Sequence, residues 1–155
     1  MVISLRKFLL LREEFNKKGK KVVFTNGCFD IIHLGHLRYL SRAKELGDIL
    51  TVAVNTDSSI RKFKERNRPI VGEKERAGLV DGLKPVDYVI LFKEETPKKI
   101  IEKIKPDVLV KGADYKINQI VGADFVKSIG GDVKRIKMTP GVSTTEIIEK
   151  IKKLD

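Results

Sequence analysis

The sequence predicts an α/β fold in which a parallel sheet of five strands is covered by helices on both faces. Short runs rich in β-branched and aromatic residues alternate along the chain with segments whose apolar residues recur at helical spacing. Strands that alternate with helices are typical of parallel sheets with both faces covered. The 155 residues have the length of one ordinary domain, which we divide into an N-terminal helix within 1–18 and a core over 20–155.

The first third of the chain begins with an amphipathic segment. Apolar residues recur near helical spacing over 4–16, so we expect a helix that packs on the domain or on a second subunit of a homodimer. A buried strand is predicted over 21–25, a turn over 26–30 and a helix over 34–46. The apolar run 49–54 predicts the second strand and completes a β-α-β unit.

The middle of the chain follows this second strand with polar residues at 55–57. The basic segment 58–68 has two interpretations that the residues leave open, a solvated loop or helix face and an anion-binding element. A helix is predicted over 73–83 and the third strand over 88–92.

The last third supplies the remaining two strands of the predicted sheet. Thr96 is expected as the N-cap and Pro97 as the first residue of a helix that a later proline stops. The fourth and fifth strands are predicted over 107–110 and 133–138. The final helix is predicted over 144–153, and the residues at its start have the spacing of a capping box.

The turn after the first strand leads into the motif H-x-G-H, formed by His33, Gly35 and His36. If the helix begins by residue 33, the two imidazoles share one helix face, and the glycine lets a ligand approach the backbone. N–H groups of a helix start at the carboxyl edge of a parallel sheet attract phosphate oxygens. We therefore favour a phosphate-handling site over two histidines that only happen to lie at a helix start. A zinc site lacks a third ligand nearby, and a dinucleotide site lacks the pattern G-x-G-x-x-G.

The single cysteine and the short apolar runs indicate where the protein resides. Cys28 excludes an internal disulfide and fits a reducing compartment. A small residue packed in a tight turn explains it better than a nucleophile, because nothing in the sequence shows how the thiol would be activated. No apolar run approaches the roughly 20 residues of a membrane span, and no signal peptide precedes the first strand. We expect a cytoplasmic protein without a membrane partner.

The chain is basic, with 32 Lys and Arg against 21 Asp and Glu and a net charge of +11. Such a charge fits nucleic acid, an anionic membrane surface or phosphorylated small molecules, and it does not choose among them. The basic clusters lack the interleaved aromatic residues that a platform for single-stranded nucleic acid needs. We therefore expect no specific nucleic-acid partner.

Five motifs together resemble the cytidylyltransferase-like nucleotidyltransferases, and within them the branch that adenylylates heptose 1-phosphates. They are N-G-C-F-D-x-x-H-x-G-H at 26–36, R-P at 68–69, E-R at 75–76, V-K-G-A-D-Y at 110–115 and G-V-S-T-T-E-I-I at 141–148. Any one of them would occur by chance, but the five occur in the right order with compatible spacing. The resemblance covers the chain from about residue 20 onward.

The resemblance implies a Rossmann-like fold and a nucleotidyl transfer. The implied reaction joins AMP from ATP to D-glycero-D-manno-heptose 1-phosphate, giving ADP-heptose for the lipopolysaccharide core, and pyrophosphate. A phosphate monoester is already largely dianionic at neutral pH, so this reaction needs no general base. The implied cofactor is Mg²⁺ bound mainly through the ATP phosphates, with no metal site formed by side chains.

The same resemblance implies the site residues. His33 and His36 match the catalytic pair that contacts the triphosphate and stabilises the charge of the transition state. The residues expected to bind the nucleotide are Gly27, Cys28, Phe29, Ser143, Thr144 and Thr145. The residues expected to bind substrate or phosphate are Asp30, Lys62, Lys64, Arg76 and Lys111.

Several alternatives remain open at the level of sequence. Cys28 and the segment 138–140 favour the heptose branch over the glycerol-3-phosphate cytidylyltransferases, whereas Ala113 stands where the heptose branch more often has glycine. A flavin-type adenylyltransferase is a further enzymatic alternative. A nucleotide or nucleic-acid binding module is the non-enzymatic one. Many heptose enzymes carry a sugar kinase on the same chain, and 155 residues leave no room for it, so we expect a separate kinase.

Overall fold

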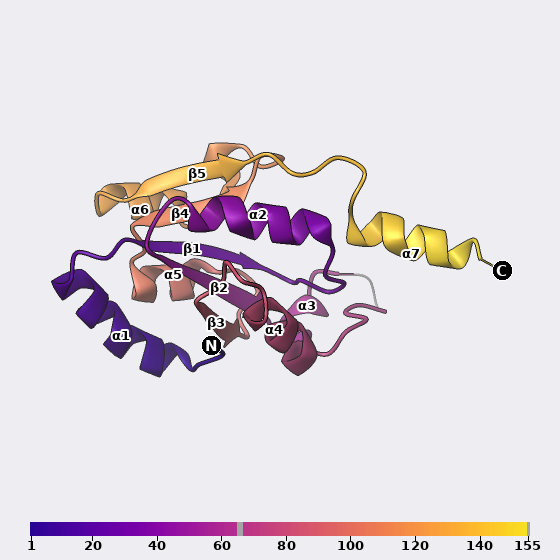
Figure 1. Cartoon of the computed structure of the whole chain (residues 1–155), viewed down its shortest axis with the longest axis horizontal. Helices are drawn as coiled ribbons and strands as arrows, with labels where there is room; N and C mark the ends of the chain where they lie inside the picture. Colours follow the sequence, from indigo (N-terminus) through magenta and orange to yellow (C-terminus); the bar gives the residue numbers. More distant parts are fainter. Residues whose placement is uncertain (65–66, 155) are drawn as a thin grey trace.

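Five parallel strands form one sheet in the order β3-β2-β1-β4-β5, as the computed structural model shows (Figure 1). The structure describes residues 1–64 and 67–154. The strands are β1 (Val22–Gly27), β2 (Ile49–Asn55), β3 (Tyr88–Phe92), β4 (Val108–Gly112) and β5 (Asp132–Ile136). The predicted α/β class and the parallel five-stranded sheet are therefore confirmed.

Strand β1 lies at the centre of the sheet. Val22 of β1 pairs with Ile49 of β2, and Val23 pairs with Val108 of β4. The chain adds β2 and β3 on one side of β1 and then crosses to add β4 and β5 on the other side. In such a sheet the connections diverge at the carboxyl ends of the two strands that flank this reversal, and ligands bind there. The topology therefore points to the carboxyl ends of β1 and β4.

Two apolar clusters cover the two faces of the sheet. The first contains Tyr39 and Leu40 of α2 (Leu34–Lys44) and Val80 of α4 (Glu73–Asp81). The second contains residues of α1 (Leu5–Lys17), α5 (Lys98–Ile104) and α6 (Ala123–Ser128). Burial of these apolar side chains drives the packing of the helices against the strands.

The N-terminal helix α1 packs on the domain, which confirms one of its two predicted roles. Phe8 is fully buried in the second cluster, and its ring meets the ring of Tyr88 edge-on at 5.5 Å. The Arg12 guanidinium is also buried, with 7% of the residue exposed. It donates to the carbonyls of Ile104 and Lys105 and to the Asp107 carboxylate, and so joins α1 to the connection between α5 and β4.

The structure corrects the predicted start of one helix and adds three short elements. Pro97 is the N-cap of α5 and not its first helical residue, and Thr96 lies outside the helix. The elements that the sequence analysis did not predict are α3 (Asp57–Ile60), the 3₁₀ turn η1 (Ile117–Gln119) and α6. All three have no more than six residues, so they contain too few repeats of apolar spacing to indicate a helix.

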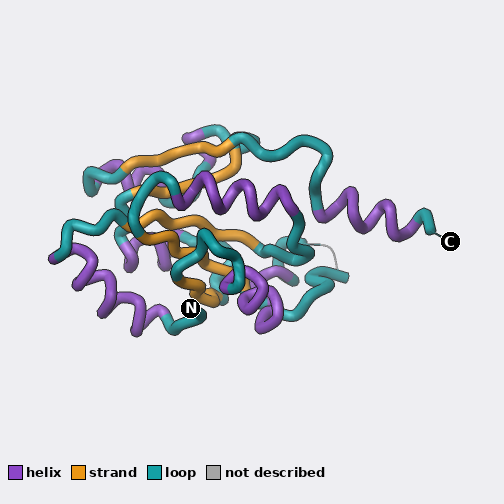
Figure 2. The backbone as a smooth tube through the Cα atoms, viewed as in Figure 1, coloured by secondary structure: helices purple, strands orange, loops and turns teal. Residues whose placement is uncertain are grey.

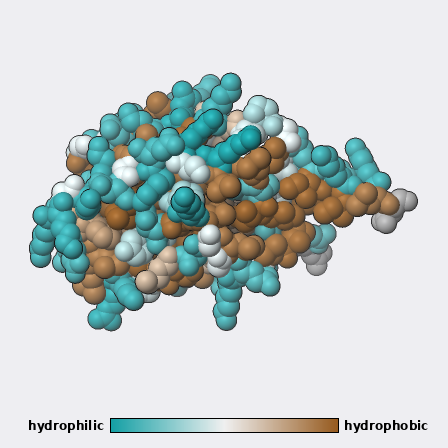
Figure 3. Space-filling model, viewed as in Figure 1, coloured by the Kyte–Doolittle hydropathy of each residue, from teal (hydrophilic) through white to brown (hydrophobic). Residues whose placement is uncertain are grey.

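The C-terminal helix α7 (Thr144–Lys152) extends away from the body of the protein (Figures 1 and 2). None of its residues is buried, and Ile151 is 56% exposed. The space-filling view shows apolar side chains along this helix that continue onto the neighbouring part of the molecule (Figure 3). No helix within the described part of the chain is long and apolar enough to cross a membrane.

Replacement of Arg12 by Ala is expected to lower the free energy of unfolding by about 2–3 kcal/mol, because two carbonyls and the Asp107 carboxylate lose their charged donor. Urea unfolding followed by circular dichroism measures this change. The matched control is Arg6→Ala on the exposed side of α1, for which we expect a change below about 0.5 kcal/mol. Equal stabilities of the two variants would contradict the assigned role of Arg12.

Candidate active site

A cavity of about 570 Å³ lies at the carboxyl ends of the strands. Its walls come from the ends of β1, β2 and β4, from the loops that precede α4 and α5, from η1, and from the first turn of α7. The loops that join these elements gather at one end of the sheet (Figure 2), toward which the arrows of β1 and β5 point in Figure 1. The cavity therefore occupies the place that the strand order indicates.

The imidazole of His36 lines this cavity. Its Nδ1 accepts the backbone N–H of His33 at 3.4 Å, so in the neutral ring the proton is on Nε2. Burial, together with the neighbouring His33, lowers the pKa of His36 to about 4. His36 is therefore a neutral hydrogen-bond donor at pH 7 and not a cation.

His33 stacks on His36 and is not among the residues that line the cavity. The two rings stack with their centroids 3.9 Å apart, and burial lowers the pKa of His33 although the Glu146 carboxylate opposes the shift. A Cβ on Gly35 would stand only 2.9 Å from the ring of His33. The glycine of the motif therefore makes room for the ring of His33, and its role in admitting a ligand stays a prediction.

Asp30 has its carboxylate engaged within the protein. Oδ1 accepts the N–H groups of Ile70 and Val71 at 2.8 and 2.9 Å, and Oδ2 accepts from Arg68 at 2.5 Å. Burial alone would raise the pKa of Asp30, but these donors hold it below its ordinary value. Asp30 lies at the cavity wall, where its contacts position the loop before α4.

Arg76 was expected to bind phosphate, and the structure does not support that role. Its side chain is fully buried and does not line the cavity. The guanidinium donates to the carbonyls of Cys28, Asn55 and Val71 and to the carboxylate of Asp57. Because these partners use its donors, Arg76 organises the chain beneath the cavity and does not reach a ligand.

The turn after β1 presents its backbone to the cavity. Gly27, Cys28 and Phe29 all line it, and Phe29 has a positive φ of 50°. A Cβ on Gly27 would stand 3.0 Å from the Phe29 ring, so a side chain at this position would displace that ring. Burial raises the pKa of the Cys28 thiol. The thiol is therefore protonated at neutral pH, in agreement with the packing interpretation of Cys28.

Two of the predicted lysines reach the cavity and one does not. Lys111 and Lys64 line it, whereas Lys62 lies outside it. The Lys111 ammonium donates to the carbonyl of Asn26 at 3.2 Å, and burial lowers the pKa of Lys111 to about 8. Lys111 therefore still carries its charge in most molecules at pH 7.

Three hydroxyl-bearing residues were predicted to bind phosphate at the start of α7, and two of them line the cavity. Thr144 and Thr145 line the cavity, and Ser143 does not. The Ser143 Oγ accepts the N–H of Glu146 at 3.1 Å, which is the ordinary N-cap interaction. The Thr144 hydroxyl donates to the carbonyl of Ile31 at 3.4 Å and so links α7 to the loop before α2.

The sequence analysis did not name several residues that line the cavity as site residues, although its motifs include Arg68 and Tyr115. Examples are Asn55, Arg68, Glu95, Thr96 and Tyr115. Asn55 and Tyr115 stand at or just after strand ends, and a rule that selects all polar residues at strand ends would have found them. Glu95 and Thr96 belong to a loop that folds back toward β2, and no local pattern indicates such a contact.

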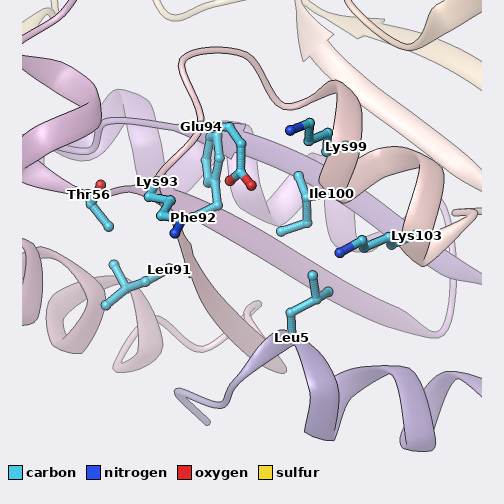
Figure 4. A pocket seen from close by; sticks show the side chains of 9 residues that line it. All are labelled: Leu5, Thr56, Leu91, Phe92, Lys93, Glu94, Lys99, Ile100 and Lys103. Carbon is cyan, nitrogen blue, oxygen red and sulfur yellow. The ribbon is translucent and has the colours of Figure 1, made fainter.

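A second and smaller cleft of about 340 Å³ lies beside β3 and α5 (Figure 4). Its lining includes Lys93, Lys99 and Lys103, together with Glu94 and Leu5. The three lysines are exposed, and neither histidine of the motif contributes to this cleft. The first cavity is therefore the candidate active site.

Comparisons with known proteins identify the family of this chain. The family described as Cytidylyltransferase-like matches residues 24–150. The chain is 53% identical over 136 residues to the bifunctional protein HldE of Citrifermentans bemidjiense, which covers 88% of the chain and 28% of that protein. It is 54% identical over 143 residues to the bifunctional protein HldE of Campylobacter concisus, with coverage of 92% and 29%. The chain thus spans less than a third of the length of these relatives.

Solved structures show the same fold and the same family. The lipopolysaccharide core biosynthesis protein from Thermoplasma volcanium is 36% identical and superposes with a TM-score of 0.63 over 78% of this chain and 98% of its own. Pantothenate synthetase from Thermus thermophilus has a TM-score of 0.64 over 98% of this chain and 70% of its own, and at 15% identity it shows the fold alone. On the family match and on these identities, this chain belongs to the cytidylyltransferase-like family.

Proposed function

We propose that the chain transfers AMP from ATP to D-glycero-D-manno-heptose 1-phosphate and releases pyrophosphate, for synthesis of the lipopolysaccharide core. The observation that carries the proposal is a neutral hydrogen-bond donor, His36, in a cavity that also holds the cations of Lys64, Arg68 and Lys111. The 36% identity to the lipopolysaccharide core biosynthesis protein of Thermoplasma volcanium supports the pathway, and the identity to the HldE proteins supports the acceptor.

The reaction requires two anions to meet. An oxygen of the sugar 1-phosphate forms a bond to the α-phosphorus of ATP, and the bond from that phosphorus to the bridging oxygen of the β-phosphate breaks. Pyrophosphate leaves with the electron pair. Because the nucleophile is already dianionic, the protein contributes alignment and charge neutralisation rather than proton removal.

The described side chains fit these tasks. The Nε2–H of His36 would donate to an oxygen of the triphosphate as negative charge increases on it. The Lys111 and Lys64 ammonium groups would neutralise phosphate charge, and the hydroxyls of Thr144 and Thr145 would bind phosphate oxygens beside the N-terminal N–H groups of α7. His33 would act by holding the ring of His36 in place.

The proposal includes Mg²⁺, which would neutralise the triphosphate when bound. No group of three or more His, Cys, Asp or Glu side chains suited to a metal occurs among residues 1–64 and 67–154. Mg²⁺ retains several waters and binds chiefly through substrate phosphates, so it would enter with ATP and would need few ligands from the protein. The homodimer and the separate heptose kinase stay predictions.

The alternative functions differ from the proposed one in the acceptor, in the nucleotide base or in having no catalytic activity. A glycerol-3-phosphate cytidylyltransferase or a flavin-type adenylyltransferase would use the same phosphate contacts with another partner. A nucleotide or nucleic-acid binding module would use the positive net charge to bind its ligand and would catalyse no reaction. The HldE relatives favour the heptose acceptor over both enzymatic alternatives, because the match covers 88% of this chain at 53% identity.

The first test is pyrophosphate release in the presence of Mg²⁺, with ATP and CTP each combined with heptose 1-phosphate, glycerol 3-phosphate and flavin mononucleotide. We expect turnover only with ATP and the heptose. Turnover with a different pair would move the substrate but keep the roles of the cavity residues. No turnover with any pair would favour the binding module.

His36→Ala is expected to lower turnover by about two to three orders of magnitude, because it removes a donor that acts in the transition state. His33→Ala is expected to cost less, because the ring of His33 touches His36 and not the cavity. Single-turnover kinetics measure both, with Arg38→Ala on the exposed side of α2 as the control. A change within about twofold for His36→Ala would exclude His36 from the chemistry.

The neutral state of His36 has a pH consequence. Its folded-state pKa is lowered to about 4, so the ring gains no proton between pH 8 and pH 5, and titration followed by NMR should show a midpoint near 4. The acid limb of kcat/KM should instead follow the second ionisation of the acceptor phosphate, near pH 6. In His33→Ala the midpoint of His36 should rise, because one neighbouring positive charge is lost. A midpoint near 6.5 in the unmodified protein would contradict the neutral-donor role.

A further inference from the structure

The wall of the cavity near β3 holds a carboxylate that the proposed reaction does not use. Glu95 and Thr96 lie in the loop between β3 and α5, and both line the cavity. The Glu95 side chain forms no ion pair with any residue in the described part of the chain. Glu95 is solvent-exposed, and its carboxylate adds a negative charge to a cavity that would receive two phosphate-bearing substrates.

Carboxylates and phosphates cannot bind each other directly. Both are hydrogen-bond acceptors when ionised, and their charges repel. A carboxylate does accept hydrogen bonds from hydroxyl groups, and it can accept two at once. Glu95 therefore matches a part of the substrates that carries hydroxyl donors and no charge.

The other carboxylates of the cavity are already accounted for. Asp30 accepts two N–H groups and the Arg68 guanidinium. Asp114 lies near the Lys111 ammonium, whose charged form it favours. Glu95 is thus the carboxylate in this cavity to which the described structure gives neither a hydrogen bond nor a charge partner.

A buried hydrogen-bond chain fixes the loop that carries Glu95. The Asn55 side-chain amide donates to the Ser59 hydroxyl at 3.0 Å, and that hydroxyl donates to the carbonyl of Glu94 at 2.7 Å. Ser59 is fully buried and Asn55 is 4% exposed. The backbone immediately before Glu95 is therefore held against the end of β2, and this support limits the positions that the carboxylate can take.

The cations and the free carboxylate occupy different parts of the chain. Lys64 and Arg68 precede α4 and Lys111 lies at the end of β4, whereas Glu95 and Thr96 follow β3 at the edge of the sheet. Pro97 and Val121 add apolar surface to the cavity. A few placed polar groups amid apolar surface are what orient a small ligand in a pocket.

We propose that Glu95 and Thr96 bind hydroxyl groups of the sugar part of the acceptor and thereby select a polyhydroxylated sugar phosphate over acceptors with few hydroxyls. The assignment rests on the proposed function and deepens it, because it names the residues that recognise the acceptor. ATP is bound through other parts of the cavity, so its affinity is independent of Glu95.

The test measures the KM of ATP and the KM of heptose 1-phosphate for the Glu95→Ala variant and for the wild-type protein. Loss of hydrogen bonds to a charged group should raise the KM of the sugar phosphate about 10- to 100-fold and leave the KM of ATP within about twofold. Glu95→Gln should recover part of the loss, because its amide oxygen still accepts one hydroxyl.

The direction of the change in the KM of the sugar phosphate shows whether Glu95 binds hydroxyl groups or only repels the anionic acceptor. If Glu95 only repelled the anionic acceptor, its removal would lower the KM of the sugar phosphate. Glu94→Ala is the matched control, since it removes the same charge from the adjacent position. The Glu94 side chain lines the other cleft (Figure 4), so both KM values should stay within about twofold.

The outcomes separate this assignment from the proposed function. If the wild-type protein turns over ATP and heptose 1-phosphate but Glu95→Ala leaves the KM of the sugar phosphate unchanged or lowers it, only the role of Glu95 is overturned. An equal rise of the acceptor KM in Glu94→Ala does the same. No turnover of ATP and heptose 1-phosphate by the wild-type protein overturns the proposed function, and the assignment with it.

Discussion

The buried guanidinium of Arg76 is the interaction on which the candidate site depends. It is fully buried and binds the carbonyls of Cys28, Asn55 and Val71 together with the carboxylate of Asp57. These partners come from the ends of two strands and from the loop before α4. A buried charge needs hydrogen-bonding partners of this kind, so the guanidinium holds these segments together. Cys28 and Asn55, whose carbonyls it binds, both line the cavity, so Arg76 stabilises this part of the cavity wall.

Above this base the site combines neutral and charged donors. Burial keeps His36 uncharged, whereas Lys111 retains most of its charge at pH 7 although burial lowers its pKa to about 8. A neutral imidazole can donate a hydrogen bond without attracting the resting triphosphate as strongly as a cation would. Interactions that strengthen only as charge develops favour the transition state over the bound substrate. The difference between His36 and Lys111 thus suits the proposed reaction, in which ATP would bind and pyrophosphate would leave.

The loop before α5 contributes residues to both clefts. Glu94 faces the cleft with three lysines, and Glu95 faces the candidate active site. These two adjacent glutamates therefore have different surroundings. The buried chain from Asn55 through Ser59 to the Glu94 carbonyl keeps this loop in register with β2. Under the proposed role of Glu95, acceptor recognition would depend on the packing of this loop against β2.

The sequence by itself determined the α/β class, the five strands and the location of the site after β1, because periodicity and turn residues are local properties of the chain. It also named His36, Lys64, Lys111, Thr144 and Thr145, which all line the cavity. Only the tertiary structure decided that Arg76 is buried, that the ring of His33 stacks on the ring of His36, and that Glu95 lines the cavity. These placements depend on contacts between residues far apart in the chain, such as the 48 positions that separate Arg76 from Cys28. No local pattern encodes such contacts, so they follow from the packing of the whole domain.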